Sequence, residues 1–330
     1  MKKYIVMLLL LASFCMGQTI HSKPNADWWS GDLSKDIAWK WAKGIEGTVN
    51  GRNPGTTFYV DGNKLTAGNG STWETAFNTL SAAMAASHAD IAVKADRQWA
   101  SRNTIYVMGD EITEDLVILA QKTDIIGVGS NDGYGKAGIT GTWIIPDTVD
   151  YMGCHFYNMM FTDPGATAIF DLDTQGGIEF HNCLFDMGAA STIAVQAEES
   201  SWLVINGCEF SAVSATLPWT TVAIVIVQDT NPIYGCKITN NLIMGGAIGI
   251  DWNETESYNC WITDNYIRAT GLTIDEEGDN VFVVNNRLIT DVDTTTSTAG
   301  YDFNIQLAAG NIQMGVTGLG DTIPFTKIAE

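Results

Sequence analysis

Cationic side chains are scarce in this 330-residue chain, and they are unevenly distributed. The sequence has 17 Lys and Arg against 38 Asp and Glu, which gives a formal net charge of −21. Residues 141–330 hold 24 carboxylates and only 4 cations, which are Lys237, Arg268, Arg287 and Lys327. Such a charge repels the phosphates that dominate nucleic-acid affinity, and it repels anionic membranes unless metal ions intervene. We therefore expect no nucleic-acid partner.

Long apolar runs are also missing, apart from one near the start of the chain. Residues 5–14 form an apolar run after Lys2 and Lys3, and it is too short to cross a bilayer. A basic start, an apolar middle and small residues near Gly17 predict a signal peptide over residues 1–17. An uncleaved arm buried in a core or interface is the alternative. We expect a secreted or cell-surface protein with no membrane span.

The motifs of common catalytic and metal sites are absent as well. The sequence has no Ser-His-Asp order, no HExxH, no phosphate-cradling glycine loop and no dinucleotide fingerprint. Five cysteines follow the leader, without the CxxC spacing of metal sites. Each lies within an apolar strand pattern, so we expect buried free thiols, although export would permit disulfides. They are Cys154, Cys183, Cys208, Cys236 and Cys260.

A repeated seven-residue block is the strongest signal that the sequence does contain. The first block covers residues 155–161, and the others begin at residues 179, 204, 237, 261 and 282. Each block has large apolar residues at its second and seventh positions, and further short strands are expected between the blocks. Periods of this length are typical of solenoids, in which stacked coils bury a core that no single coil can bury.

Equivalent positions of the blocks predict three columns of stacked side chains. The second position gives Phe156, Phe180, Ile205, Ile238, Ile262 and Val283. The seventh position gives Phe161, Phe185, Phe210, Ile243, Ile267 and Leu288. The fifth position gives Met159, Cys183, Cys208, Asn241, Asn265 and Asn286. We expect the first two columns to face inward and the asparagine amides to bond from coil to coil at a turn.

An aromatic-rich segment over residues 18–56 precedes the repeats. Trp29, Leu33, Ile37 and Trp41 follow one another at helical spacing and would form one apolar stripe. Such a stripe either packs over an end of the body or serves as an interface to a partner or second copy. 

A strand and a helix are expected between this segment and the first coil, over residues 57–103. Thr57–Gly62 predicts the strand and its turn. Ser71 with Glu74 three residues later has the pattern of a capping box, which would start an amphipathic helix there. The helix would cover one end of the solenoid.

The opening FYVDG at residues 58–62, then GSTWETAF at 70–77, then coils with Asn-Cys or Asn-Asn turns, resembles one known superfamily. It is that of the right-handed parallel β-helix proteins called pectin-lyase-like, and the resemblance covers residues 57–290. It implies an all-β, right-handed parallel β-helix over residues 104–290, with a short N-terminal helical cap and a last coil or tail at 291–330. Tailspikes, adhesins and polysaccharide lyases share this fold, so the resemblance leaves the activity open.

Carboxylates provide the best candidate for chemistry on the coils. Asp251 and Asp275 are 24 residues apart, so they should stack on adjacent coils, with Asp229 and Glu277 in a neighbouring column. Stacked acids form a solvated edge, bind calcium or act as a catalytic pair. Lyases of the superfamily combine calcium and carboxylates with an Arg or Lys base, for which Arg268 is the candidate. The shortage of cations and histidines departs from the lyase and hydrolase patterns alike.

Tryptophans and histidines give the remaining candidates. Trp219 in the longest coil, with Trp252 and Trp261, is predicted to lean outward and either stack on a sugar or contact another subunit. His155 and His181 occupy the first and third positions of their blocks, so we expect rim histidines and no stacked pair.

These patterns predict an exported, rigid β-helix scaffold with a structural or adhesive role. It would be a surface, fibre or spike-like component that associates with copies of itself or contacts polysaccharide. The alternative is a calcium-assisted polysaccharide lyase or glycoside hydrolase that uses Asp251, Asp275 and Arg268. No cofactor is predicted other than calcium.

Overall fold

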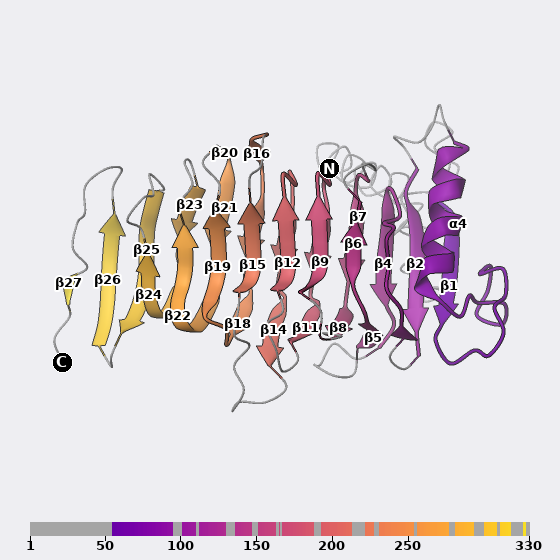
Figure 1. The fold of residues 1–330 in the computed structure, drawn as a ribbon, viewed down its shortest axis with the longest axis horizontal. Helices are drawn as coiled ribbons and strands as arrows, with labels where there is room; N and C mark the ends of the chain where they lie inside the picture. The colour runs from indigo at the N-terminus through magenta and orange to yellow at the C-terminus, as the bar shows by residue number, and fades with distance from the viewer. Residues whose placement is uncertain are drawn as a thin grey trace, which may run out of the picture. The chain divides into compact units, whose positions relative to one another are not determined.

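A computed structural model describes residues 55–94, 101–109, 112–129, 136–146, 151–162, 165, 167–187, 193–212, 222–227, 231–253, 256–276, 281–293, 300–308, 311–317 and 326–327. Thr56–Ala95 and Arg102–Glu330 form one compact unit, in which short strands follow one another as a parallel β-helix (Figure 1). The predicted signal peptide and the stripe of Trp29, Leu33, Ile37 and Trp41 lie outside the described residues.

Three ladders of parallel strands make up the β-helix. Ladder A contains β1 (Thr57–Asp61), β2 (Asn103–Met108), β4 (Thr123–Gly127), β7 (Cys154–Tyr157), β10 (Glu179–His181), β13 (Val204–Asn206), β17 (Lys237–Thr239), β21 (Cys260–Thr263), β23 (Val281–Val284) and β25 (Gly300–Ala308). Its register places the second-position residues of the blocks opposite one another, as predicted.

Ladders B and C complete each coil. Ladder B contains β3 (Ile112–Thr113), β5 (Ala137–Thr140), β8 (Met159–Thr162), β11 (Leu184–Met187), β14 (Glu209–Ala212), β18 (Leu242–Met244) and the first parts of β22 (Tyr266–Glu276) and β24 (Arg287–Asp293). Ladder C contains β6 (Trp143–Ile145), β9 (Ala168–Asp173), β12 (Ile193–Glu198), β15 (Val222–Val227), β19 (Ile248–Asn253) and the second parts of β22 and β24. The seventh-position column is confirmed in ladder B.

Two small sets of strands lie beside the ladders. β16 (Ile233–Tyr234) pairs in parallel with β20 (Ser257–Tyr258) at the corner that precedes ladder A. At the C-terminal end, β25 pairs in parallel with β23 but antiparallel with β26 (Asn311–Thr317), which pairs antiparallel with β27 (Thr326–Lys327). The parallel pairing therefore ends at β25, and antiparallel pairing follows it.

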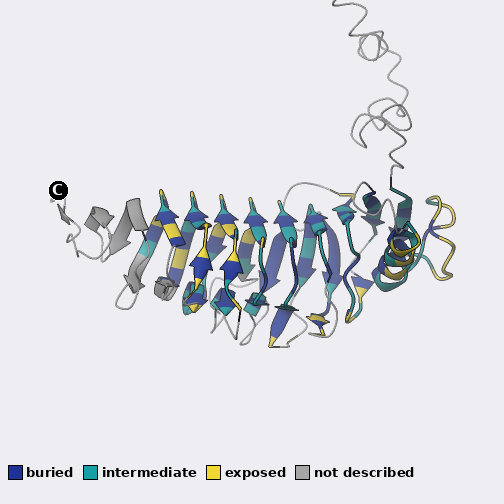
Figure 2. Cartoon of the chain, turned by 90° about the horizontal axis from the view of Figure 1, so that it is seen from above, coloured by how far each residue is buried: buried dark blue, intermediate teal, exposed yellow. Residues whose placement is uncertain are grey.

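The core runs through consecutive coils because alternate residues of each strand face inward. Figure 2 shows buried residues repeating along the row of strands. Phe156 stacks on Phe180 with ring centroids 5.1 Å apart, and Phe185 stacks on Phe210 at 4.5 Å. Like rings at one position of successive coils fill the same interior site, so each coil buries the apolar face of the next.

The predicted asparagine column forms a buried hydrogen-bonded ladder. The Oδ1 of Asn265 accepts from the backbone N–H of Asn241 at 2.9 Å, and the Oδ1 of Asn286 accepts from that of Asn265 at 3.0 Å. The thiol sulfur of Cys208 accepts in the same way from the N–H of Cys183 at 3.4 Å. These bonds satisfy backbone groups that the turn removes from the strand ladders.

The helix begins later than the sequence predicts. α4 (Leu80–Ala92) is capped by Thr79, whose side chain accepts from Ala82, so the prediction of a cap at Ser71 is wrong. The physical reason is pairing with β1, since Phe77 donates its N–H to the Tyr59 carbonyl at 2.9 Å and the chain stays extended there. Buried apolar residues of α4 join the core of the first coils. Among the described residues, no helix has the length and apolar character that a membrane crossing requires.

Candidate functional site

The outer face of ladder A holds two groups of side chains that differ in chemistry. The first and third positions of each block point away from the core, so they form two outward columns. Polar and charged residues gather in these columns at β4, β7 and β10, whereas Trp261 and Phe282 occupy the first-position column at β21 and β23. Asp124, His155, Glu179, Trp261 and Phe282 therefore share one outward column of ladder A.

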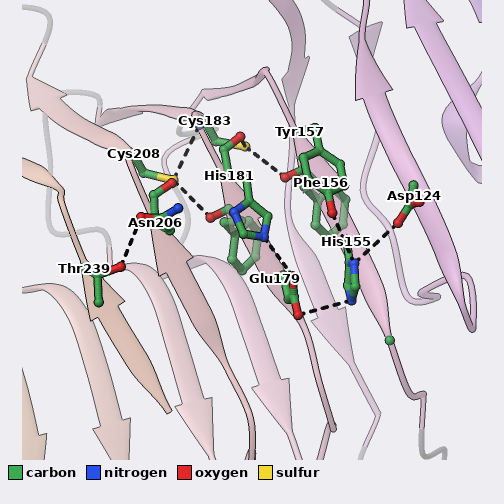
Figure 3. Close-up of polar contacts among 12 residues, drawn as sticks. Asp124, His155, Phe156, Tyr157, Glu179, His181, Cys183, Asn206, Cys208 and Thr239 are labelled. Carbon is green, nitrogen blue, oxygen red and sulfur yellow. Dashed lines mark hydrogen bonds and ion pairs between the residues drawn. The ribbon is translucent and has the colours of Figure 1, made fainter. Parts of the chain in front are cut away.

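The charged group, which we call the His155 cluster, connects β4, β7 and β10 through Asp124, His155, Glu179 and His181 (Figure 3), and Arg102 just before β2 joins it. Arg102 contributes its Nε to Asp124 at 2.7 Å and its Nη2 to the Nε2 of His155 at 2.6 Å. The Nε2 of His155 lies 3.5 Å from Glu179, and the Nε2 of His181 lies 2.7 Å from the other oxygen of Glu179. Three basic side chains therefore surround two carboxylates across neighbouring coils.

Electrostatics within the His155 cluster favour the charged carboxylate. The hydrogen bond from His181 lowers the pKa of Glu179 most strongly, against the opposing effect of burial. Burial and the nearby charges of Asp124 and Glu179 raise the pKa of Tyr157 to about 12, so its hydroxyl stays protonated. Both ring nitrogens of His155 already face partners within the cluster. His155 therefore suits a structural link between strands better than a catalytic base, which would need a free nitrogen for a substrate.

The sequence pattern did not predict this cluster. His155 and His181 do occupy different columns, as predicted, since His155 pairs with Glu179 and Tyr157 pairs with His181. The structure nevertheless links both histidines through Glu179, two residues before His181 on the same strand face. That i, i+2 spacing was the available signal, whereas Arg102 lies too far away in the sequence to be found from it.

The aromatic group, which we call the aromatic strip, lies on later coils. It consists of Trp202, Tyr234 and Tyr258 at the corner that precedes ladder A, and of Trp261 and Phe282 on ladder A itself. Their exposed fractions are 53% for Trp202, 44% for Tyr234, 43% for Tyr258 and 41% for Phe282, and Trp261 is half-buried. Large apolar rings exposed together on one face mark a surface that contacts something.

Stacking holds the rings of the aromatic strip in place. The rings of Tyr234 and Tyr258 stack at 5.2 Å, and those of Trp261 and Phe282 stack at 4.4 Å with an interplanar angle of 21°. Gly235 lets Trp202 lie against the corner, because an added Cβ would meet the Cδ1 of Trp202 at 2.6 Å. The side chains are thus ordered before any partner arrives, which lowers the entropic cost of binding.

Of the three tryptophans predicted to lean outward, the structure describes two. Trp252 does not lean outward, so that prediction is wrong: it is fully buried, and its Nε1 donates to the Oγ of Ser257 at 2.9 Å. Strand alternation explains this, because Asp251 faces outward on β19 and its neighbour must then face inward. Trp261 occupies an outward position of ladder A. Trp219 lies outside the described residues.

The structure describes two of the four carboxylates that were predicted to stack. Asp251 and Asp275 are register partners of β19 and β22, as the repeat predicts, on ladder C. Arg268 is exposed and pairs with Met244 on ladder B, so its part of β22 belongs to a different ladder from Asp275. Asp229 and Glu277 lie outside the described residues. Within the described ranges no three His, Cys, Asp or Glu residues gather as metal ligands, and calcium binding stays a prediction.

The cysteines follow the expectation of buried free thiols. Cys154, Cys183, Cys208, Cys236 and Cys260 are all free and buried. Burial raises the pKa of Cys154 to about 12, which keeps this thiol protonated and unreactive at neutral pH.

Comparison with known proteins gives no relative. No family model, no curated protein and no solved structure matches this chain.

Proposed function

We propose that this protein is an exported, rigid β-helix scaffold with a structural or adhesive role, which contacts polysaccharide through the aromatic strip. The observation that carries the proposal is two pairs of stacked rings that reach the surface: Tyr234 with Tyr258 at the corner before ladder A, and Trp261 with Phe282 on ladder A. Aromatic rings offer sugars an apolar contact area at little entropic cost. The proposal also places the chain in the pectin-lyase-like superfamily, on the strength of its opening segment and its Asn-rich turns.

The strands that hold Trp261 and Phe282 support a scaffold role. Trp261 and Phe282 project from strands whose inward neighbours, Ile262 and Val283, are fully buried. The asparagine ladder fixes the turn that follows these strands. A binding surface on such strands is more rigid than one on loops.

Support for export comes from the N-terminal pattern of basic residues, apolar run and small residues over residues 1–17. Self-association is part of the proposal, because exposed rings also suit a contact between copies. Size-exclusion chromatography and negative-stain microscopy of the secreted protein should show oligomers or filaments. A strictly monomeric particle would remove self-association from the proposal.

Binding of polysaccharide is tested by affinity electrophoresis in gels that contain one soluble polysaccharide each. We expect Tyr258→Ala and Trp261→Ala each to migrate with less retardation. The apparent affinity for the polysaccharide should fall at least about fivefold in each, because each variant loses one aromatic contact. Ile144→Ala is the matched control, because Ile144 is an exposed apolar residue on ladder C, away from the strip. Equal retardation of all three variants would reject the aromatic strip as the binding surface.

A calcium-assisted lyase or hydrolase is the second candidate, and the register of Asp251 with Asp275 favours it. Neighbouring strands lie about 4.8 Å apart, so carboxylates at paired positions of two coils would suit a shared cation. Release of reducing ends from a polysaccharide panel, with and without chelator, tests this candidate. Activity that Asp251→Asn abolishes would establish an enzyme, and a protein that binds without cleaving would reject it.

A further inference from the structure

Trp202 has a backbone conformation that large side chains rarely adopt. Its φ is 58°, in the left-handed region, where the Cβ of an L residue crowds the following carbonyl oxygen. Glycine takes this conformation freely and asparagine tolerates it, whereas a bulky residue there is an outlier. A tryptophan at this place therefore costs the fold free energy that a smaller residue would not.

The neighbouring coils show which residues the same corner otherwise uses. Trp202 is aligned with Gly177 on the coil before it and with Gly235 on the coil after it. The N–H of Gly177 donates to the Ser201 carbonyl at 2.9 Å, and the N–H of Trp202 donates to the Tyr234 carbonyl at 2.6 Å. The corner column, all with positive φ, is Lys122, Gly153, Gly177, Trp202, Gly235 and Asn259. Glycine and asparagine fill most of it, so the corner itself does not require a large side chain.

Packing recovers little of the cost of this conformation. A Cβ added at Gly235 would meet the Cδ1 of Trp202 at 2.6 Å and its Nε1 at 3.1 Å, so this edge of the indole lies against the corner. Trp202 is nevertheless 53% exposed, more than any other ring of the aromatic strip. Since more than half of the residue stays in water, burial of apolar area does not explain why a tryptophan is present.

We propose that Trp202 is the anchoring contact for an uncharged polysaccharide, and that its strained backbone is retained because it holds the indole ring at the surface. This proposal rests on the proposed function and deepens it by naming the anchor and the class of sugar. Strained backbone conformations gather at ligand-binding sites. The indole offers a large apolar area to the C–H groups of a pyranose ring, and its contact with Gly235 orders it before binding.

Charges on the two sides of the corner favour an uncharged chain. Glu199 precedes the corner, and its carboxylate accepts from the backbone N–H and the Nδ2 of Asn231, each at 2.7 Å. Lys237 follows the corner on the outward column of ladder A. A polyuronate is repelled by Glu199 and by the acidic excess of residues 141–330, and an amine-bearing chain is repelled by Lys237. An uncharged polysaccharide meets neither repulsion.

Affinity electrophoresis of the full chain tests the anchor. Hydroxyethyl cellulose and galactomannan are the neutral probes, and polygalacturonate is the anionic probe. We expect at least one neutral probe to retard the wild type. Trp202→Gly should weaken the apparent affinity about tenfold because the ring is lost, whereas Trp202→Tyr, which keeps a ring, should stay within about threefold of the wild type. Lys122→Gly is the matched control, since it removes a non-aromatic side chain at the same corner position, and it should bind as the wild type does.

The denaturation midpoint is the second measurement, because binding and packing roles predict opposite results. If Trp202 is retained for binding, Trp202→Gly relieves the backbone, and its midpoint should be no lower than that of the wild type while its affinity falls. Trp202→Asn should behave in the same way, since asparagine tolerates the left-handed region and adds less chain freedom than glycine. A midpoint clearly below the wild type in both variants would show that the ring is held for packing, and would overturn the proposal.

Binding outcomes separate the anchor from the proposed function. Wild-type affinity in Trp202→Gly would overturn the anchor, as would tighter binding of polygalacturonate than of the neutral probes. Loss of self-association in Trp202→Gly with unchanged polysaccharide binding, measured by size-exclusion chromatography, would assign the ring to a contact between copies and would also reject the anchor. If Tyr258→Ala or Trp261→Ala weakens binding and Trp202→Gly does not, the proposed function survives without the anchor. If the wild type binds no polysaccharide, both proposals fail.

Discussion

Replacing Asn265 by alanine is the most direct test of how the coils are held together. Asn265 is buried, and its side chain makes four hydrogen bonds to adjacent coils. Its Oδ1 accepts from the backbone N–H and the Nδ2 of Asn241 at 2.9 and 3.0 Å. Its Nδ2 donates to the Ile238 carbonyl and to the Oδ1 of Asn286, each at 2.9 Å.

The expected loss in the free energy of unfolding follows from the backbone groups that would lose their hydrogen-bond partners. Asn265→Ala leaves the N–H of Asn241 and the carbonyl of Ile238 buried without these bonds, at a cost of about 1–3 kcal/mol each. We therefore expect the free energy of unfolding to fall by about 4 kcal/mol. Asn265→Leu keeps the side-chain volume without the polar atoms, so it should cost a similar amount if the bonds matter more than the packing.

The assay combines the denaturation midpoint with amide hydrogen exchange, because a repeat protein unfolds in parts and one global midpoint is not sufficient. Exchange should accelerate most at the amide of Asn241. Thr263→Ala is the matched control, since Thr263 lies on the outward side of the same coil. The reasoning is refuted if Asn265→Ala costs less than about 1 kcal/mol, or no more than the control.

Three further predictions concern the same region and the His155 cluster. Cys208→Asn should be tolerated, and its denaturation midpoint should exceed that of Cys208→Val. The sulfur of Cys208 already accepts from a backbone N–H and its thiol donates to the Phe180 carbonyl, which are bonds that an Asn amide can also make. A lower midpoint for the Asn variant than for the Val variant would contradict this. The pKa of Glu179 is lowered in the folded state, so its charged form stabilises the protein above the usual value of 4.5, and this stabilisation is lost as the pH falls through the folded pKa. Melting temperatures of the wild type and Glu179→Gln should therefore differ at pH 7 and converge in acid, and a constant difference would count against the cluster. Cys154 should react with a thiol reagent at pH 8 only after denaturation, since it is buried and its pKa is about 12, and rapid labelling of the native protein would disprove its burial.

The stacked columns were predictable because they depend on a local pattern that repeats. Phe180 and Ile205 occupy equivalent block positions, and parallel coils of similar length place such positions in register. The same argument placed Asp251 opposite Asp275 and Asn241 below Asn265. In each case the spacing along the chain and the alternation of the strand were sufficient.

The sites on the outer face depend on contacts that the spacing does not encode. Arg102 reaches His155 across 53 residues of sequence, so its place in the His155 cluster is decided by the winding of the first coils. The helix starts at Leu80, after the cap Thr79, because Phe77 pairs with β1, a contact that outweighs the capping pattern at Ser71.

The sequence by itself determined that this chain is a β-helix, and which residues line its interior, because burial repeats with the coil. Only the tertiary structure decided which outward residues meet. It buried Trp252, and it placed Gly300 beside Phe282 after a segment with no repeat pattern. The physical reason is that an outward side chain is constrained by its neighbours on other coils, whose positions depend on the length and path of every intervening turn.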